Sequence, residues 1–142
     1  MARNKYPEET VEKILTAARR LFLEKGYEKT TIQDIVDQLG GLTKGAVYHH
    51  FKSKEEIMNA LTTKMFFDDN PFEKVRGRED LTGLEKMKEV VRLTQEPEWS
   101  SLSRQSLPLL KNPHMLATII EENRTIATPL WLELIEEGMA DG

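Results

Sequence analysis

The stretch that decides the fold is TTIQDIVDQLGGLTKGAVYHHFKSKEEI, residues 30–57. Its first part spaces Ile32, Ile35 and Val36 as on one face of a helix and then reaches two glycines. Its second part starts another short helix, in which small residues, histidines and lysines accompany one Tyr and one Phe. A helix, a glycine-containing turn and a second short helix form the helix-turn-helix pattern. The stretch therefore predicts a helix-turn-helix.

Side chains in this stretch also predict where its helices begin. Thr31 has Asp34 three residues further on, which indicates a variant capping box. Thr43 is placed to cap the second helix. Ser53 and Glu56 have the spacing of a full capping box for the helix that follows.

The rest of the chain has helical periodicity that only Gly and Pro interrupt. No segment alternates apolar and polar residues with a period of two, so we predict an all-α protein. Upstream, a wide apolar face predicts one helix from Pro7 until Gly26. Downstream, residues 68–83 are rich in charge, Pro and Gly, which predicts a connector with at most a short helix.

Beyond the connector, apolar repeats predict a second helical part. We expect helices around residues 84–94 and 99–110, and one or two between residues 113 and 138. A kink or interruption is expected near Pro129, because proline has no backbone N–H to donate. The last residues, EEGMADG, are loop-like in composition, so we expect the chain to end in a loop.

Composition excludes several classes of protein. The 142 residues contain no cysteine, which rules out a disulfide framework and a thiolate metal site. There is no secretory leader and no apolar run of about 18 residues, so we expect a cytoplasmic protein with no membrane partner. The net charge of -4 is uneven: residues 1–56 carry ten Lys and Arg against nine Asp and Glu, whereas the rest is strongly acidic.

The start of the second helix suits close approach to DNA. Gly45 and Ala46 are small enough to let the helix end come near base edges, and Lys44 can reach a guanine edge or a phosphate. Tyr48 and the residues after it supply hydroxyl, imidazole and ammonium donors within about two turns. Those donors predict a phosphate clamp around a reading helix: Tyr48, His49, His50, Lys52 and Lys54.

The strings TTIQDIV and LTKGAVYHHFKSKEEI resemble the N-terminal signature of the tetracycline-repressor (TetR) family of bacterial transcription regulators. The resemblance covers roughly residues 8–62. It implies an all-helical homodimer with a three-helix DNA-binding head and a ligand-binding body. In such a protein, a small molecule changes the spacing of the two heads.

Matched position by position, the resemblance assigns the DNA-binding residues. It puts Gln33 on the supporting helix, with Thr31 as that helix's cap. It puts the start of the reading helix near base edges or adjacent phosphates: Thr43, Lys44, Gly45 and Ala46. The family's phosphate-contacting positions correspond to Tyr48, His49, His50 and Lys54.

The chain departs from the family pattern in two places. The string LGGLTKG carries one residue more than the usual turn, which predicts a longer turn and a changed angle of the reading helix. Family members run to about 200 residues and end in two long dimerisation helices. We therefore expect residues 1–54 to form the DNA-binding domain, and residues 55–142 to form a ligand-binding body that lacks those C-terminal helices.

Other kinds of site are less well supported. His49 and His50 point about 100° apart on a helix and no acidic residue completes an i,i+4 set with them, so no metal site is predicted. GGLTKG lacks the order of a phosphate-binding loop and follows a helix rather than a strand. No cofactor is predicted, and no Ser/His/Asp set suggests an enzyme.

Large apolar side chains in the body are candidates for a ligand cavity, although core packing is the more common role of such residues. The candidate pocket residues are Met65, Phe66, Trp99, Met115, Asn123 and Trp131. Together, these features predict a ligand-responsive regulator, a repressor that binds a palindromic double-stranded DNA operator as a homodimer and is released by a small molecule. The alternative is a helical protein-interaction module that retains a helix-turn-helix head.

Overall fold

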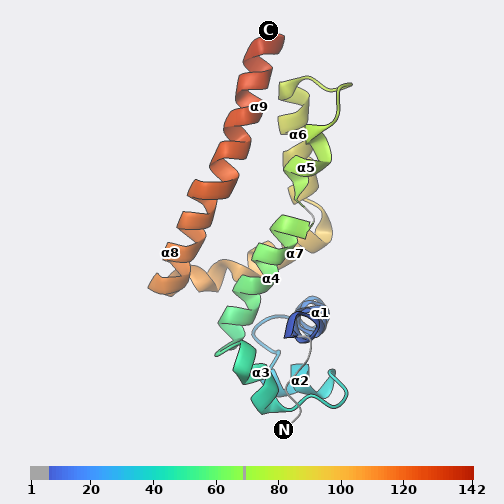
Figure 1. The fold of residues 1–142 in the computed structure, drawn as a ribbon, viewed down its shortest axis with the longest axis vertical. Helices are drawn as coiled ribbons and strands as arrows, with labels where there is room; N and C mark the ends of the chain where they lie inside the picture. The colour runs from blue at the N-terminus through green and yellow to red at the C-terminus, as the bar shows by residue number, and fades with distance from the viewer. Residues whose placement is uncertain (1–6, 69) are drawn as a thin grey trace. The chain divides into compact units, whose positions relative to one another are not determined.

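The computed structural model describes residues 7–68 and 70–142, and every regular element in those ranges is helical (Figure 1). This confirms the predicted all-α class. The chain forms two compact units, of which the first ends at Thr63 and the second starts at Lys64. That division falls inside a helix, later than the predicted domain boundary after Lys54. Within the described ranges, no helix is both long and apolar enough to cross a membrane.

Helices α1 (Pro7–Lys25), α2 (Ile32–Asp37) and α3 (Lys44–His50), with the first part of α4 (Lys54–Asp68), make up the first unit, called the head below. Of the three apolar residues that periodicity placed on one face of α2, Ile35 is fully buried, whereas Ile32 and Val36 are half buried. Fully buried side chains come from each of its helices: Ile14, Phe22, Ile35, Val47 and Ile57. The head is thus a helix-turn-helix braced by α1 and α4.

The corner between α1 and α2 is closed by hydrogen bonds to the end of α1. Gly26 takes a φ of 87°, a left-handed conformation that suits glycine and ends the helix. Thr30 is buried, and its hydroxyl donates to the Gly26 carbonyl oxygen at 2.8 Å. The next residue, Thr31, caps α2 together with Asp34, which confirms the predicted capping box. The corner and the start of α2 therefore form one continuous hydrogen-bonded segment.

The turn between α2 and α3 accounts for the extra residue. α2 ends at Asp37, so Gln38 to Leu42 are free to turn the chain. Gly40 and Gly41 have φ values of 43° and 101°, both in the region that L side chains rarely adopt. Two consecutive left-handed residues thus lead the chain to Thr43, whose side chain accepts a hydrogen bond from the Ala46 N–H and caps α3.

The start of α4 differs from the predicted capping box. The Ser53 hydroxyl accepts from the Glu56 N–H at 3.2 Å, as predicted. The Glu56 carboxylate, however, accepts from the backbone N–H of Lys52 at 2.7 Å rather than from that of Ser53. Phe51 is extended (φ -132°, ψ 124°), so the chain leaves α3 in a direction that presents the Lys52 N–H to Glu56.

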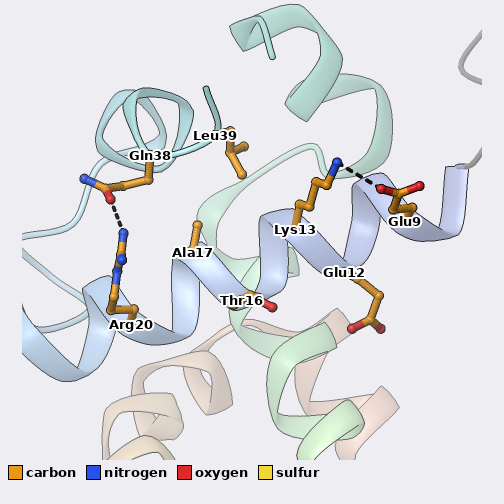
Figure 2. Close-up of a pocket in the computed structure, with 8 residues that line it drawn as sticks. All are labelled: Glu9, Glu12, Lys13, Thr16, Ala17, Arg20, Gln38 and Leu39. Atoms are coloured by element: carbon orange, nitrogen blue, oxygen red, sulfur yellow. Dashed lines mark hydrogen bonds and ion pairs between the residues drawn. The ribbon is translucent and has the colours of Figure 1, made fainter. Parts of the chain in front are cut away.

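An open groove lies along one side of α1 in the head (Figure 2). Its lining includes Ala17 and Leu39, and Leu39 is half buried. Arg20 donates to the side-chain oxygen of Gln38 across the groove, and Lys13 pairs with Glu9 along its rim at 3.0 Å.

The second unit contains α5 (Pro71–Arg76), α6 (Gly83–Thr94), α7 (Pro97–Ser106), α8 (Pro113–Glu122) and α9 (Thr128–Asp141). The predicted connector holds only the short α5, and α7 ends in a 3₁₀ turn at residues 107–111. A π-helical turn, Asn123–Ala127, separates α8 from α9. This turn confirms the interruption expected near Pro129. Its physical cause is that Pro129 has no backbone N–H to donate to the carbonyl of residue 125.

The expected loop at the end of the chain is wrong, because α9 continues to Asp141. Gly138 does not break the helix; it is the point where α9 meets the start of α6. A Cβ added to Gly83 would lie 2.2 Å from the Gly138 nitrogen and 2.7 Å from the Leu134 oxygen. The two helix backbones therefore approach each other directly at this pair of glycines.

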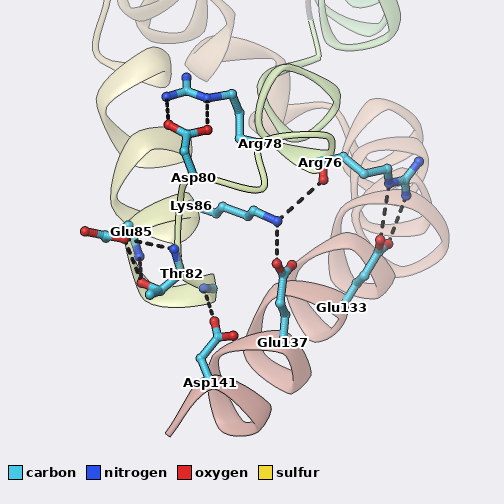
Figure 3. Close-up of polar contacts among 10 residues, drawn as sticks. Arg76, Arg78, Asp80, Thr82, Glu85, Lys86, Glu133, Glu137 and Asp141 are labelled. Carbon is cyan, nitrogen blue, oxygen red and sulfur yellow. Dashed lines mark hydrogen bonds and ion pairs between the residues drawn. The ribbon is translucent and has the colours of Figure 1, made fainter.

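Acidic residues one turn apart on α9 bind the segment formed by α5 and α6 (Figure 3). Glu133 accepts two hydrogen bonds from the Arg76 guanidinium, at 2.9 and 3.2 Å. Glu137 pairs with Lys86, whose side chain is only 5% exposed. Asp141 accepts from the Gly83 backbone N–H at 2.6 Å. Beside this ladder, Phe72 and Trp131 pack edge to face at a centroid distance of 4.9 Å.

Candidate nucleic-acid interface

The first turn of helix α3 is exposed to solvent, and the opposite side of the helix is buried in the head. Val47 is fully buried and Phe51 is 8% exposed, so these two side chains fix the helix on the head. Thr43, Lys44 and Gly45 are exposed, and Ala46 is half buried. The Cβ of an added side chain at Gly45 would meet only the Thr43 hydroxyl, at 3.8 Å. This end of the helix is therefore small, capped and accessible.

The second turn of α3 carries the polar aromatic residues. Tyr48 is 39% exposed, His49 is exposed and His50 is half buried. The two imidazole rings lie edge to face with centroids 5.2 Å apart. Hydroxyl and imidazole donors thus extend the accessible surface beyond the first turn, alongside the exposed Lys52.

Helix α2 contributes a fixed side chain rather than a loose one. Gln33 is exposed, and its amide nitrogen donates to the Asp37 carboxylate at 2.8 Å. At the start of α2, Asp34 accepts from Lys25 at 2.8 Å and from the Thr31 N–H at 2.9 Å. The hydrogen bond from Lys25, followed by that from Thr31, lowers the pKa of Asp34 from 3.8 to about 2. The helix that braces α3 is therefore capped and tied to the end of α1.

A family model described as "Bacterial regulatory proteins, tetR family" matches residues 14–61, which include all of α2 and α3. Residues 14–61 belong to this family. The chain is 31% identical over 140 residues to the HTH-type transcriptional repressor KstR2 of Rhodococcus jostii, a match that covers 91% of this chain and 65% of that repressor. It is also 31% identical over 99 residues to the HTH-type transcriptional repressor Rv1474c of Mycobacterium tuberculosis, covering 70% of this chain and 50% of the relative.

The likeness extends beyond the head. A solved structure described as "Probable transcriptional regulatory protein RHA5900" aligns with a TM-score of 0.58 at 26% identity, covering 93% of this chain and 72% of the other. The chain spans half to about two thirds of the length of the two curated repressors. The family resemblance recognised from the helix-turn-helix stretch is thus confirmed, and the names of the relatives support a DNA-binding regulator.

Lys54 is the last of the predicted phosphate contacts in this tetR-family head. Its side chain forms hydrogen bonds to other residues of the head. Its ammonium donates to the Tyr27 carbonyl oxygen at 2.7 Å and, more weakly, to that of Glu28 at 3.4 Å. The same nitrogen lies 4.3 Å from the centroid of the Tyr27 ring. Sequence reasoning missed this partner, because Tyr27 lies 27 residues before Lys54 and no local spacing connects them.

Of the six predicted pocket residues, two pack against the same core cluster of the second unit. Phe66 and Trp131 pack against the core cluster around Phe72, and Met65 and Met115 are buried. Trp99 is half buried, and Asn123 is exposed and donates to the Ile119 carbonyl oxygen at 2.8 Å. None of the six lines the groove of Figure 2, which belongs to the head. Over the described ranges, no group of three potential ligands is placed to hold a metal ion.

Proposed function

We propose that this chain is a ligand-responsive transcription repressor that binds a palindromic DNA operator as a homodimer, in the cytoplasm, and is released by a small molecule. The single observation that carries DNA binding is the exposed, capped first turn of α3, held in place by the buried Val47 and Phe51. Repressors among the relatives support the regulatory role.

In this proposal, α3 enters the major groove by its N-terminal end. Lys44 is the side chain that reads a base edge or binds the adjacent phosphate, since Gly45 and Ala46 allow the backbone to come close. Thr43, Gln33, Tyr48, His49 and His50 donate to the flanking phosphates. Because the chain has a net charge of -4, this local set of donors, and not the overall charge, has to attract the DNA.

A homodimer would place two α3 helices in successive major grooves, roughly 34 to 36 Å apart on one face of the duplex. A small molecule bound to the second unit releases the operator only if it binds better to a conformer whose helices no longer match that spacing.

The deciding experiment is selection of bound duplexes from a random pool at near-physiological salt. We expect enrichment of a palindrome with half-sites about one helical turn apart. Lys44→Ala should relax preference at one operator position, whereas Lys111→Ala, which changes an exposed lysine of the second unit, should leave the selected sequence unchanged. A folded, dimeric protein that enriches no sequence would contradict the proposal and favour the protein-interaction module.

A selected duplex then serves as the probe for the effector. Compounds that weaken its binding at constant salt are the candidates, and reciprocity requires that the duplex weaken binding of the compound by the same factor. A compound that lowers the affinity of the protein for the duplex without this reciprocal effect either binds the DNA itself or denatures the protein.

A further inference from the structure

Lys54 makes three contacts with one residue pair, all in the corner between α1 and α2. Two are hydrogen bonds to the carbonyl oxygens of Tyr27 and Glu28, and the third is the stacking of the ammonium over the Tyr27 ring. We propose that Lys54 is a positioning residue, which fastens the start of α4 to this corner and supports DNA binding through it rather than by contact with a phosphate. The inference rests on the proposed function for its DNA-binding part only.

The position of Lys54 in its own helix favours this role. A cation in the first turn of a helix faces the positive end of the helix dipole, where acidic residues such as Glu55 and Glu56 are preferred. The Lys54 side chain instead reaches the Tyr27 carbonyl oxygen, two residues past the last residue of α1, where the negative end of that helix dipole attracts a cation. The ammonium is therefore better placed at the corner than beside its own helix.

The start of α4 is also a poor phosphate site. Two of its backbone donors are already used: the Glu56 N–H by Ser53 and the Lys52 N–H by the Glu56 carboxylate. A phosphate placed here would meet the negative charges of Glu55 and Glu56. To reach a phosphate, the Lys54 ammonium would further have to leave both the Tyr27 oxygen and the Tyr27 ring.

The corner between α1 and α2 is well packed, so it can hold the start of α2 in place. Tyr27 is 7% exposed and packs edge to face on Phe22 with centroids 5.3 Å apart. Burial, followed by the nearby charges of Glu55 and Glu28, raises the pKa of Tyr27 to about 12, so its ring is neutral and the contact with Lys54 is a cation–π contact. Further along the corner, the Thr30 hydroxyl donates to the Gly26 carbonyl oxygen, and Thr31 caps α2, which braces α3. Loosening the corner therefore loosens the support of the reading helix.

The proposal is tested with the full chain and a selected operator duplex, by measuring affinity over a range of salt concentrations. Lys54→Met keeps the length of the side chain and removes the ammonium. We expect about tenfold weaker binding with an unchanged slope of log affinity against log salt, because no phosphate contact is lost. Lys54→Arg, which can donate to the Tyr27 oxygen and stack on the ring, should restore most of the affinity. Lys44→Ala is the comparison that loses up to about 0.9 from the slope if Lys44 binds a phosphate.

Hydrogen exchange supplies a second readout that needs no DNA. Lys54→Met should speed amide exchange at residues 26–36, and Lys54→Arg should not. A slope reduced by about 0.9 without faster exchange would overturn the proposal and make Lys54 a phosphate contact. Unchanged affinity would also overturn it, as would unchanged exchange. If the unmodified protein bound no duplex, the proposed function would fail, and exchange at the corner would still decide whether Lys54 fastens it.

Discussion

At the scale of single residues, Asp34 shows how one exposed carboxylate can join two helices. It completes the capping box of α2 with Thr31 and accepts from Lys25 at the end of α1. The cap was predictable, because Thr31 and Asp34 are three residues apart. The bond to Lys25 was not, because it depends on how the corner folds back and has no spacing rule.

The depressed pKa of Asp34 makes its contribution dependent on pH. Since the pKa is about 2 in the folded chain and near its ordinary value of 3.8 when unfolded, the stabilisation is present above pH 3.8 and is lost as the pH falls towards 2. We predict that the Asp34→Asn variant has a lower free energy of unfolding than the unmodified chain at pH 6. This difference should shrink as the pH falls from 3.8 to about 2. Urea denaturation between pH 2 and 6 measures it.

The matched control for Asp34 is the same substitution in a chain that carries Lys25→Met. Because the hydrogen bond from Lys25 is the largest cause of the lowered pKa, the effect of Asp34→Asn should shrink in that background. An effect of equal size in both backgrounds would mean that Lys25 does not contribute.

At the scale of elements, the turn between α2 and α3 carries the one local feature that departs from the family pattern. The sequence predicted a longer turn and a changed helix angle; the φ values of Gly40 and Gly41 are what only the structure supplies. Of the two, Gly40 has the φ of the left-handed helical region, which Asn also tolerates, whereas the φ of 101° at Gly41 lies outside it.

We predict that Gly41→Ala destabilises the head by about 1 to 2 kcal/mol, because a residue with a Cβ disfavours that backbone conformation. The added Cβ itself would clash with no neighbouring atom. Gly40→Asn should change stability by less than about 0.5 kcal/mol. Chemical denaturation gives both values, and equal effects of the two substitutions would show that the conformation of Gly41 is not what matters.

The contact between α6 and α9 was the element-scale failure of sequence reasoning. Gly138 looks like a helix breaker in EEGMADG, and nothing nearby in the sequence indicates that it meets Gly83. The same holds for the pairing of Lys86 with Glu137, which joins residues 51 positions apart.

The two substitutions that break the ion pair between Lys86 and Glu137 should destabilise the chain to different extents. Glu137→Gln leaves the buried ammonium of Lys86 without its carboxylate and should cost about 2 kcal/mol, less than for a fully buried pair because Glu137 is 35% exposed. Lys86→Met removes the buried charge itself and should cost less. Urea denaturation of both single variants and the double variant measures the coupling, and a larger loss for Lys86→Met than for Glu137→Gln would contradict this account.

At the scale of the whole molecule, the chain divides into two compact units, and the second contains a core cluster around Phe72. The sequence predicted the helical class, the helix-turn-helix and most helix positions, because caps, glycines and apolar periodicity are local signals. The packing of the second unit and the places of the six pocket candidates depend on contacts between distant segments, which is why neither could be read from spacing.

We predict that Gly83→Ala destabilises the second unit by about 3 kcal/mol, because its Cβ would overlap the backbone of α9. Hydrogen exchange should accelerate in α5, α6 and α9, while α1 to α3 keep their protection. Gly77→Ala, at an open position of the same unit, is the control and should be near neutral. Faster exchange throughout both units would show that they unfold as one.

The two left-handed glycines before α3 also limit how the DNA specificity of this protein can be re-engineered. The backbone path through residues 38–43 leads directly into α3, so we expect a helix copied into this head from a relative with a shorter turn to take a different tilt. A transferable cassette must therefore run from Gln38 to Phe51, with the turn, the cap and the buried anchor moved together.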